Sequence, residues 1–468
     1  MDSSAQPDRL SSLPDVVLIM IISCLPFKDC VKTSTLSKRW KSLYRETRAV
    51  AFKESDFVSP SLYGDSRLYA RIAFLRYAYK WIASSNDQPI HSFEISMSSP
   101  EVYLEKINSL VTFAVRKKVK KLVLDFSHPT WRSFRDVKDL PRMLGFEVPE
   151  SVYGLNTLES LKLWACKKFE PWRFVNQGIF KNLSLGYMRL PNLESFLRAA
   201  SKLESFSINR CWDVMKIAGN MRELVIEDCS LFSVQCSFYM PRVEIFKYSG
   251  DAFYLQFLNI DRNNVKEVHL DFGVYDEYNQ LMGTTFPPGL ICQLLNVLPP
   301  TRTLVVCQYL LQVFQSFECP FVFPPVKTQH LILKTRLYPK EFNGIRFLLN
   351  NCPDLETLTF DMLPPSSIVI DLLDPDFDPQ TYWVQNITDN NWRKTLKAVV
   401  VRNFIGGPNE LNMVKYFILS QCEGEIVLEN VELYVSYGLE ESQKTVAYAG
   451  VEMLQRISKH VQVLVHNS

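Results

Sequence analysis

The segments that decide the fold are four short runs in the first half of the chain: LESLKLWAC (158–166), FKNLSLGY (180–187), LESFSINRC (203–211) and MRELVIEDC (221–229). In each run, large apolar residues alternate with polar ones, which is the pattern of a strand that buries one face. The central apolar residues follow one another at steps of 22, 23 and 18 residues: Leu161, Leu183, Phe206 and Leu224. Strands that recur at a nearly regular period predict repeated units that stack on their neighbours.

The same alternation continues on both sides of these runs, in VKKLVLDF (119–126), VKEVHLDF (265–272), TRTLVVCQ (301–308), KTQHLILK (327–334), LETLTFDM (355–362) and LKAVVVRN (396–403). Later steps are longer, with 27 residues from Leu331 to Leu358. These lengths approach the roughly 20 to 29 residues of a leucine-rich repeat, whose strand lines the concave face while a helix or loop returns outside. We therefore predict an α/β fold whose body is an irregular leucine-rich-repeat solenoid with a curved parallel sheet.

Cysteines and turns follow several of these runs, in Ala165-Cys166, Arg210-Cys211 and Asp228-Cys229. In leucine-rich repeats, this position buries a small residue that ties the turn. The eleven cysteines are an odd number and include no C-x-x-C pair, in a chain too long to need disulfides for a core. We therefore expect reduced, buried thiols, and short outer helices over 193–203 and 347–355.

The N-terminal segment contains the start and stop signals of three short helices; it reads LSSLPDVVLIMIISCLPFKDCVKTSTLSKRWKSLY (10–44). Ser12 is the candidate N-cap of the first, with Pro14 near its first turn, and Pro26 closes it. A second runs over 28–36, and Ser37 begins the third. The segment carries many large apolar residues for its length, namely Val17, Leu18, Ile21, Ile22, Leu25, Leu36, Trp40 and Leu43. So short a segment cannot bury all of them alone, which predicts a partner that covers some.

From Leu13 to Leu43 this segment resembles the plant-type F-box without a gap; Val16 and Tyr44 are small departures from the family's usual residues. The resemblance implies docking on the Skp-type adaptor of a cullin–RING ubiquitin ligase. It also implies a set of candidates for contact with the adaptor or for supporting packing: Leu13, Pro14, Ile22, Leu25, Leu36 and Trp40. The alternative interpretation is a helical cap that folds onto the rest of the chain.

The remaining segments complete the predicted domain organisation. Helices over 69–81 and 102–115 are interpreted as an atypical cap of the array, next to the F-box. The stretch WRKTLKAVVVRNFIGGPNELNMVKYFILSQC (392–422) resembles the FBD region that follows such repeats, with Asn409 as the cap of a helix. The predicted domains are the F-box (1–50), a helical connector (51–115), the repeats (116–390) and an FBD-like closing region (391–468).

Charge and motifs exclude several functions. Fifty-two Lys and Arg against fifty Asp and Glu give a net charge of +2, so no global field attracts nucleic acid. G-x-S-x-G, P-loop, H-E-x-x-H and G-x-G-x-x-G motifs are absent, so we expect no catalytic residues, no cofactor and no enzyme. Asp374, Asp376 and Asp378 resemble a calcium loop, but Pro379 and Gln385 stand where glycine and the closing carboxylate belong, so no metal is expected.

The apolar run over 16–27 is too short to span a bilayer and lacks the flanks of a signal peptide, so we expect no membrane contact and a cytoplasmic or nuclear protein. The basic run over 116–121 fits a nuclear import signal or an anion patch, but a solvated helix end is favoured.

The resemblance implies a substrate-recognition subunit of a Skp–cullin–F-box ubiquitin ligase, with the repeats holding an unknown target protein. Outward strand positions carry mixed charge, which favours a polar protein epitope: Lys162, Ser207, Glu223, Glu227, His269 and Thr359. Two alternatives remain open at this point. One is an F-box scaffold that does not direct ubiquitination, and the other is a sensor whose array binds a small ligand.

Overall fold

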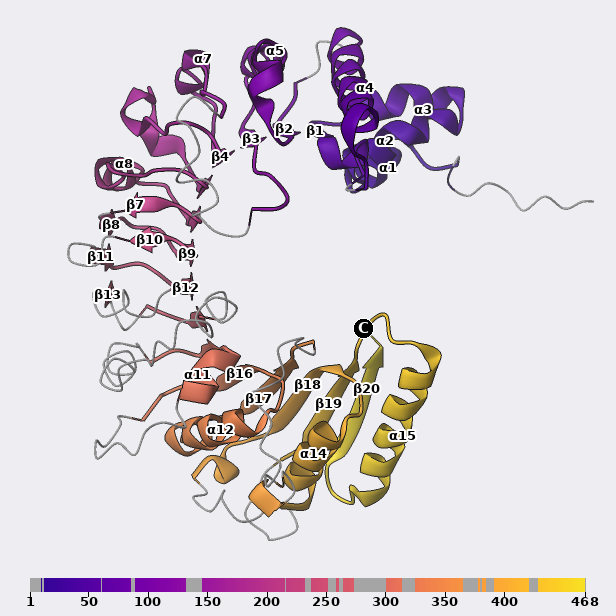
Figure 1. The fold of residues 1–468 in the computed structure, drawn as a ribbon, viewed down its shortest axis with the longest axis vertical. Coiled ribbons are helices and arrows are strands. Elements are labelled where there is room, and N and C mark those ends of the chain that lie inside the picture. Colours follow the sequence, from indigo (N-terminus) through magenta and orange to yellow (C-terminus); the bar gives the residue numbers. More distant parts are fainter. Residues whose placement is uncertain are drawn as a thin grey trace, which may run out of the picture. The chain divides into compact units, whose positions relative to one another are not determined.

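A computed structural model describes residues 10, 12–59, 61–85, 89–131, 145–214, 216–231, 237–250, 258–260, 264–272, 300–313, 325–364, 378, 381–383, 391–420 and 428–467. The chain divides into two compact units (Figure 1). Unit 1 comprises Met1–Met221 and Asp228–Cys236, and unit 2 comprises Arg222–Glu227 and Ser237–Ser468. Each unit is described by itself.

Unit 1 begins with three short helices and continues into parallel strands, each paired in register with the next. Its helices are α1 (Asp15–Ser23), α2 (Phe27–Lys32), α3 (Lys38–Leu43), α4 (Gly64–Ala83), α5 (Leu104–Arg116), α7 (Glu150–Tyr153) and α8 (Glu194–Ala199). Its main strands are β1 (Ala49–Lys53), β2 (Ser92–Ser96), β3 (Lys121–Asp125), β4 (Ser160–Trp164), β5 (Asn182–Gly186) and β6 (Ser205–Asn209). Shorter elements are η1 (Thr33–Thr35), η2 (Tyr44–Glu46), η3 (Glu54–Asp56), η4 (Pro100–Tyr103), η5 (Pro171–Arg173), η6 (Gln177–Ile179), β7 (Trp212–Val214), β8 (Lys216–Ala218) and β10 (Ser230–Leu231).

Unit 2 continues the same architecture, with parallel strands paired in sequence order. The strands are β9 (Glu223–Glu227), β12 (Ile245–Ser249), β14 (Glu267–Asp271), β15 (Thr303–Val306), β16 (His330–Thr335), β17 (Thr357–Met362), β18 (Ala398–Phe404), β19 (Asn430–Val435) and β20 (Gln462–Asn467). Figure 1 shows its longer helices along one side of these strands: α12 (Pro339–Asn351), α14 (Pro408–Ser420) and α15 (Glu441–Ile457). Further elements are α11 (Gln308–Val313), η10 (Asn391–Lys394) and the parallel pair β11 (Ser237–Met240) and β13 (Leu258–Ile260). The predicted α/β fold with helices first and a parallel repeat sheet after them is confirmed.

A recurring backbone contact sets the register of the strands. The carbonyl oxygen of Lys120, the residue before β3, accepts hydrogen bonds from the N–H groups of Glu159 at 2.8 Å and Ser160 at 2.9 Å. Arg302, before β15, does the same for Gln329 at 3.1 Å and His330 at 2.8 Å. The same double acceptance recurs at Arg48, His91, Glu159, Lys181, Arg222, Glu244, Gln329, Glu356 and Lys397. Within each unit, the residues that directly precede the strands therefore line up as a row, which we call the strand-start row.

Turns at the other end of the strands bury the predicted cysteines. Four of the strands end next to a residue in the left-handed region: Ala165 (φ 54°), Tyr187 (φ 51°), Arg210 (φ 50°) and Asp228 (φ 50°). Cys166, Cys211 and Cys229 follow such residues and are buried. The Cys211 thiol donates to the carbonyl oxygen of Asn209 at 3.4 Å, and the N–H of Cys211 donates to the Cys229 sulfur at 3.4 Å. The prediction that small buried thiols tie these turns is confirmed.

Three helix boundaries differ from the prediction. Helix α1 begins at Asp15 with Pro14 at the capping position, so Ser12 is not its cap. Helix α2 ends at Lys32, and the residues after it form the 3₁₀ turn η1. Asn409 lies inside α14 and not at its cap. Its side-chain amide donates a hydrogen bond to the carbonyl oxygen of Leu337 at 3.1 Å. Residues 314–323, an aromatic-rich stretch that fits either a binding surface or an outer loop packed on the array, lie outside the described residues. Asp374 and Asp376 of the calcium-like run lie outside them as well.

Two helices of unit 2 carry a buried glutamate as their third residue. Glu410 in α14 accepts hydrogen bonds from the N–H groups of Ile405 at 3.0 Å and Gly406 at 2.9 Å. Glu341 in α12 accepts from the side-chain amide of Gln308 at 2.5 Å and from the N–H of Arg336 at 3.1 Å. Burial raises the pKa of both carboxyl groups, although these hydrogen bonds oppose the shift. Each glutamate therefore ties the loop before its helix to the helix itself.

These raised pKa values predict a pH-dependent stability. Between the ordinary glutamate pKa and the raised one, the folded chain keeps protons on Glu341 and Glu410 that the unfolded chain releases. The stability gained from this proton binding is complete at low pH. It is lost as the pH rises from about 4.3, the ordinary glutamate value, through the raised folded-state pKa. The double variant Glu341→Gln/Glu410→Gln lacks these protons, so its melting temperature minus that of the wild type should increase with pH. Thermal unfolding across the acidic to neutral range measures this difference; a constant or falling difference would contradict it.

Close packing of α11 on α12 predicts a large effect at Gly344. A Cβ added there would lie 2.6 Å from the Cα of Leu311, which is backbone that cannot turn away. Gly344→Ala should therefore lower the free energy of unfolding by about 1–3 kcal/mol. Gly407→Ala is the matched control in the same unit, because a Cβ there meets the Glu410 side chain at an ordinary 3.9 Å. Urea unfolding compares the two, and equal losses would contradict the packing argument.

Candidate functional site

The three N-terminal helices are tied together by polar contacts at their ends. The Ser37 hydroxyl caps α3 by accepting from the N–H of Trp40 at 3.4 Å. From α3, the Arg39 guanidinium donates to the Asp15 carboxylate at 2.7 Å and to the carbonyl oxygen of Leu13 at 2.6 Å. Because the Arg39 and Asp15 side chains are largely exposed, this ion pair orients the start of α1 more than it stabilises the fold.

A small apolar core fixes this helical module to the strands. Leu18, Ile22, Cys30, Trp40 and Leu43 are buried within it. Burial raises the pKa of the Cys30 thiol to about 11, so the group stays a neutral packing residue.

Phe27 connects the module to the rest of unit 1. Its ring packs edge-on against Phe52 of β1 at 5.6 Å and against Trp81 of α4 at 5.4 Å, measured between ring centroids. The start of the strand array therefore supports the module.

The opposite side of the module is apolar and exposed to solvent. The exposed fractions of its side chains are Val16 69%, Val17 37%, Met20 65%, Ile21 38%, Leu25 39% and Leu36 65%. We call these six residues the apolar face. In α1 they lie at spacings of four residues, as do the buried Leu18 and Ile22 on the inner side. A helix that is apolar on both sides needs a second covering surface, which marks this face as an interaction site.

The structure separates the six residues predicted from the sequence into two groups. Ile22 and Trp40 are buried and support the module from inside. Leu13 is half-buried, and Pro14, Leu25 and Leu36 are exposed. Their contact with a partner stays a prediction.

The sequence analysis missed Val16 and Met20 as candidate contacts. Both are among the most exposed apolar side chains of the module. Their spacing of four residues on α1 was the available signal, since it places them on one side of the helix.

The helix-free side of the strands was the second predicted site. Lys162 and Ser207 share one register position in unit 1, and Lys247, His269 and Thr359 share the corresponding position in unit 2. Thr359 is only 4% exposed, and its row also contains Val225, Val305, Ile332, Val400 and Leu464. This row is therefore more apolar than the predicted residues indicated. Glu223 and Glu227 lie on the same side at the two ends of β9.

Within the part of the chain that the structure describes, no group of three or more His, Cys, Asp or Glu side chains is arranged to hold a metal ion. No helix over the same residues is both long and apolar enough to cross a membrane. The basic run over 116–121 lies where α5 ends and β3 begins, and its Lys120 pairs with Glu159 at 3.2 Å.

The module and the strand array together define a class of protein, an F-box protein with leucine-rich repeats. An F-box domain model matches residues 10–43. A putative F-box/LRR-repeat protein of Arabidopsis thaliana is 47% identical over 98% of each chain. A second is 44% identical over 99% of this chain and 98% of its own, and a putative F-box protein of the same plant is 42% identical over all of both chains. The chain belongs to the F-box/LRR-repeat proteins of plants.

The division of the module into core and apolar face predicts opposite effects of two similar truncations. Leu18→Ala should lower the free energy of unfolding by about 2–5 kcal/mol, because it leaves a cavity. Leu36→Ala should change it by no more than about 0.5 kcal/mol, since the side chain is mostly exposed. Urea unfolding followed by tryptophan fluorescence distinguishes them. A large loss for Leu36→Ala would show that this side chain is covered within the chain itself.

Proposed function

We propose that the chain is the substrate-recognition subunit of a Skp–cullin–F-box ubiquitin ligase. The observation that carries the proposal is the apolar face, whose six side chains stay 37–69% exposed to solvent. In the proposal, the Skp-type adaptor covers it, with Pro14, Leu25 and Leu36 in the contact and Ile22 and Trp40 holding the helices in place. The membership of the chain in the F-box/LRR-repeat family supports this choice of partner.

The proposed mechanism is proximity. The adaptor links the chain to a cullin, and the repeats hold a target protein near a ubiquitin-conjugating enzyme, which raises the effective concentration of the two reactants. The chain itself contributes no reacting side chain and no cofactor in this proposal. Its role is that of a non-catalytic adaptor, and neither nucleic acid nor membrane is among its proposed partners.

The proposal retains the predicted domains, with the F-box over 1–50, the connector over 51–115, the repeats over 116–390 and an FBD-like closing region over 391–468. An F-box/FBD/LRR-repeat protein of Arabidopsis thaliana, 24% identical over 77% of this chain and 80% of its own, supports the last of these. A cytoplasmic or nuclear location is proposed as well. It is supported by the described cysteines, all of which are free thiols.

Charge introduced on the apolar face tests the adaptor contact. Met20→Glu/Leu36→Glu alters side chains that are each 65% exposed, so the chain should fold normally. Because a few apolar side chains supply most of the binding energy at such interfaces, the affinity of the variant for a purified Skp-type adaptor should fall by about 100-fold or more. Isothermal titration calorimetry with the wild type and the variant gives the two dissociation constants.

The matched control is Tyr437→Glu/Val446→Glu, which places the same charges on exposed apolar side chains outside the module. It should bind the adaptor as the wild type does. A folded wild-type chain that captures no adaptor would contradict the proposal. Adaptor binding without ubiquitin transfer to any co-purified protein, in a reconstituted ligase, would favour the scaffold alternative.

A further inference from the structure

Neighbouring residues of the strand-start row form alternating ion pairs. In unit 1, Glu159 pairs with Lys120 at 3.2 Å and with Lys181 at 2.7 Å. In unit 2, Glu244 pairs with Arg222 at 2.9 Å and with Lys266 at 2.7 Å, and these contacts lower the pKa of Glu244 to about 2. Each unit therefore has a carboxylate of the row that pairs with the row cation on either side of it.

The alternation fails at Arg302. Its neighbours in the row are the cation Lys266 on one side and the neutral amide of Gln329 on the other. Alternation resumes with Glu356 and Lys397, which pair at 3.3 Å. Among the described residues, no carboxylate forms an ion pair with Arg302, although its side chain is exposed.

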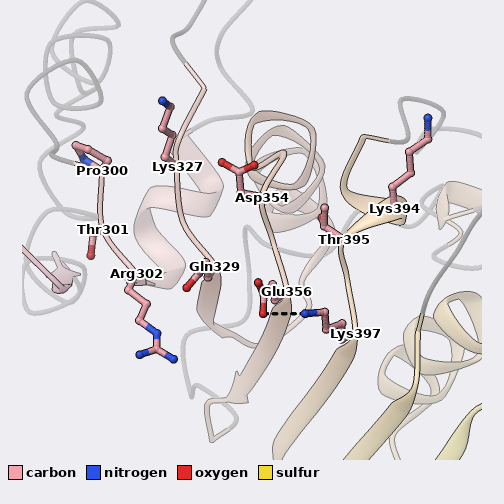
Figure 2. A pocket seen from close by; sticks show the side chains of 10 residues that line it. All are labelled: Pro300, Thr301, Arg302, Lys327, Gln329, Asp354, Glu356, Lys394, Thr395 and Lys397. Carbon is pink, nitrogen blue, oxygen red and sulfur yellow. Dashed lines mark hydrogen bonds and ion pairs between the residues drawn. The ribbon is translucent and has the colours of Figure 1, made fainter.

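A pocket of about 560 Å³ lies where the alternation fails. Figure 2 shows the residues that line it, which come from the segments that lead into four successive strands: Pro300, Thr301, Arg302, Lys327, Gln329, Asp354, Glu356, Lys394, Thr395 and Lys397. Four of these side chains are cationic and two are acidic. Over the described part of the chain, Lys327 and Lys394 also form no ion pair, so the pocket holds unmatched positive charge.

We propose that this pocket binds an extended acidic segment of a partner protein, whose carboxylates supply the negative charge that the strand-start row lacks at Arg302. If the partner is the target of the ligase, this inference names the chemistry of that target and rests on the proposed function. Every lining residue except Pro300 has a polar or charged side chain, so charge and hydrogen bonds contribute to recognition of the segment.

The arrangement of charges favours an extended segment over a compact polyanion. The starts of β15 and β18 are three strand spacings apart, which is about 14 Å, or about four residues of extended chain. Arg302 and Lys327 lie toward one end of this span, and Lys394 and Lys397 toward the other (Figure 2). Asp354 and Glu356 lie between them and repel a dense anion at the centre. The expected segment therefore has acidic residues at both ends and a neutral centre.

A designed peptide tests the proposal on the purified full-length chain. The probe is fluorescein-labelled Glu-Glu-Ser-Asn-Ser-Glu-Glu, and the matched peptide replaces each Glu with Gln. Fluorescence anisotropy should show at least tenfold tighter binding of the acidic peptide, weakening with salt as expected for exposed charges. Equal binding of the two peptides would overturn the proposal, as would displacement of neither by excess unlabelled acidic peptide.

Charge reversal locates the binding. Arg302→Glu/Lys327→Glu should lose at least tenfold in affinity for the acidic peptide and gain affinity for Lys-Lys-Ser-Asn-Ser-Lys-Lys. The control Lys168→Glu/Lys202→Glu makes the same change in net charge at exposed lysines of unit 1 and should bind as the wild type does. Equal losses in both variants would overturn the assignment to this pocket.

Two further outcomes are distinguishable. If tripolyphosphate binds the wild type through Arg302 and Lys327 while the acidic peptide does not bind, the occupant is a small polyanion and the proposal is wrong. The peptide assay needs no adaptor, so its failure leaves the proposed F-box function intact. Conversely, the pocket variant should still bind the Skp-type adaptor with wild-type affinity, because all the altered residues lie outside the module.

Discussion

The carbonyl group before most of the strands is the constraint on which the structure depends. By accepting two successive N–H groups from the next repeat, it satisfies donors that would otherwise be lost where a loop enters the sheet. It also fixes the register, because a slip of one residue would turn Leu161 and Leu163 outward and Lys162 inward. Loops of very different length, such as those before β5 and β15, can therefore be inserted without changing which side chains face the core.

The same constraint separates the surfaces on which function depends. Register aligns the residues before the strands, so charges of opposite sign pair along the row where they alternate. Arg302 has no such partner among the described residues, and it lines the pocket. The N-terminal module lies outside this repeat and is held by Phe27 against β1 and α4. Its apolar face therefore depends on packing that is independent of the strand-start row, which is why variants at the two places should act separately.

The sequence predicted the repeat strands and the buried cysteines well, because each depends on local alternation and on one turn. It predicted less about the module, since α1 is apolar on every side and periodicity cannot tell the buried Ile22 from the exposed Ile21 next to it. The Asn409 cap was wrong: the Glu410 carboxylate accepts from the N–H groups of the loop, and the Asn409 amide donates to the carbonyl oxygen of Leu337. The unmatched charge at Arg302 was hidden because its row neighbours are distant in sequence and adjacent only through the register.

The central claim is that the apolar face is the surface that a Skp-type adaptor covers. Hydrogen–deuterium exchange of the full-length chain, with and without purified adaptor, tests it most directly because it reports protection segment by segment. The account predicts that added adaptor slows exchange over residues 15–36 and leaves the strands of unit 2 unchanged. Unchanged exchange over 15–36 at saturating adaptor, or protection confined to the strands, would contradict it.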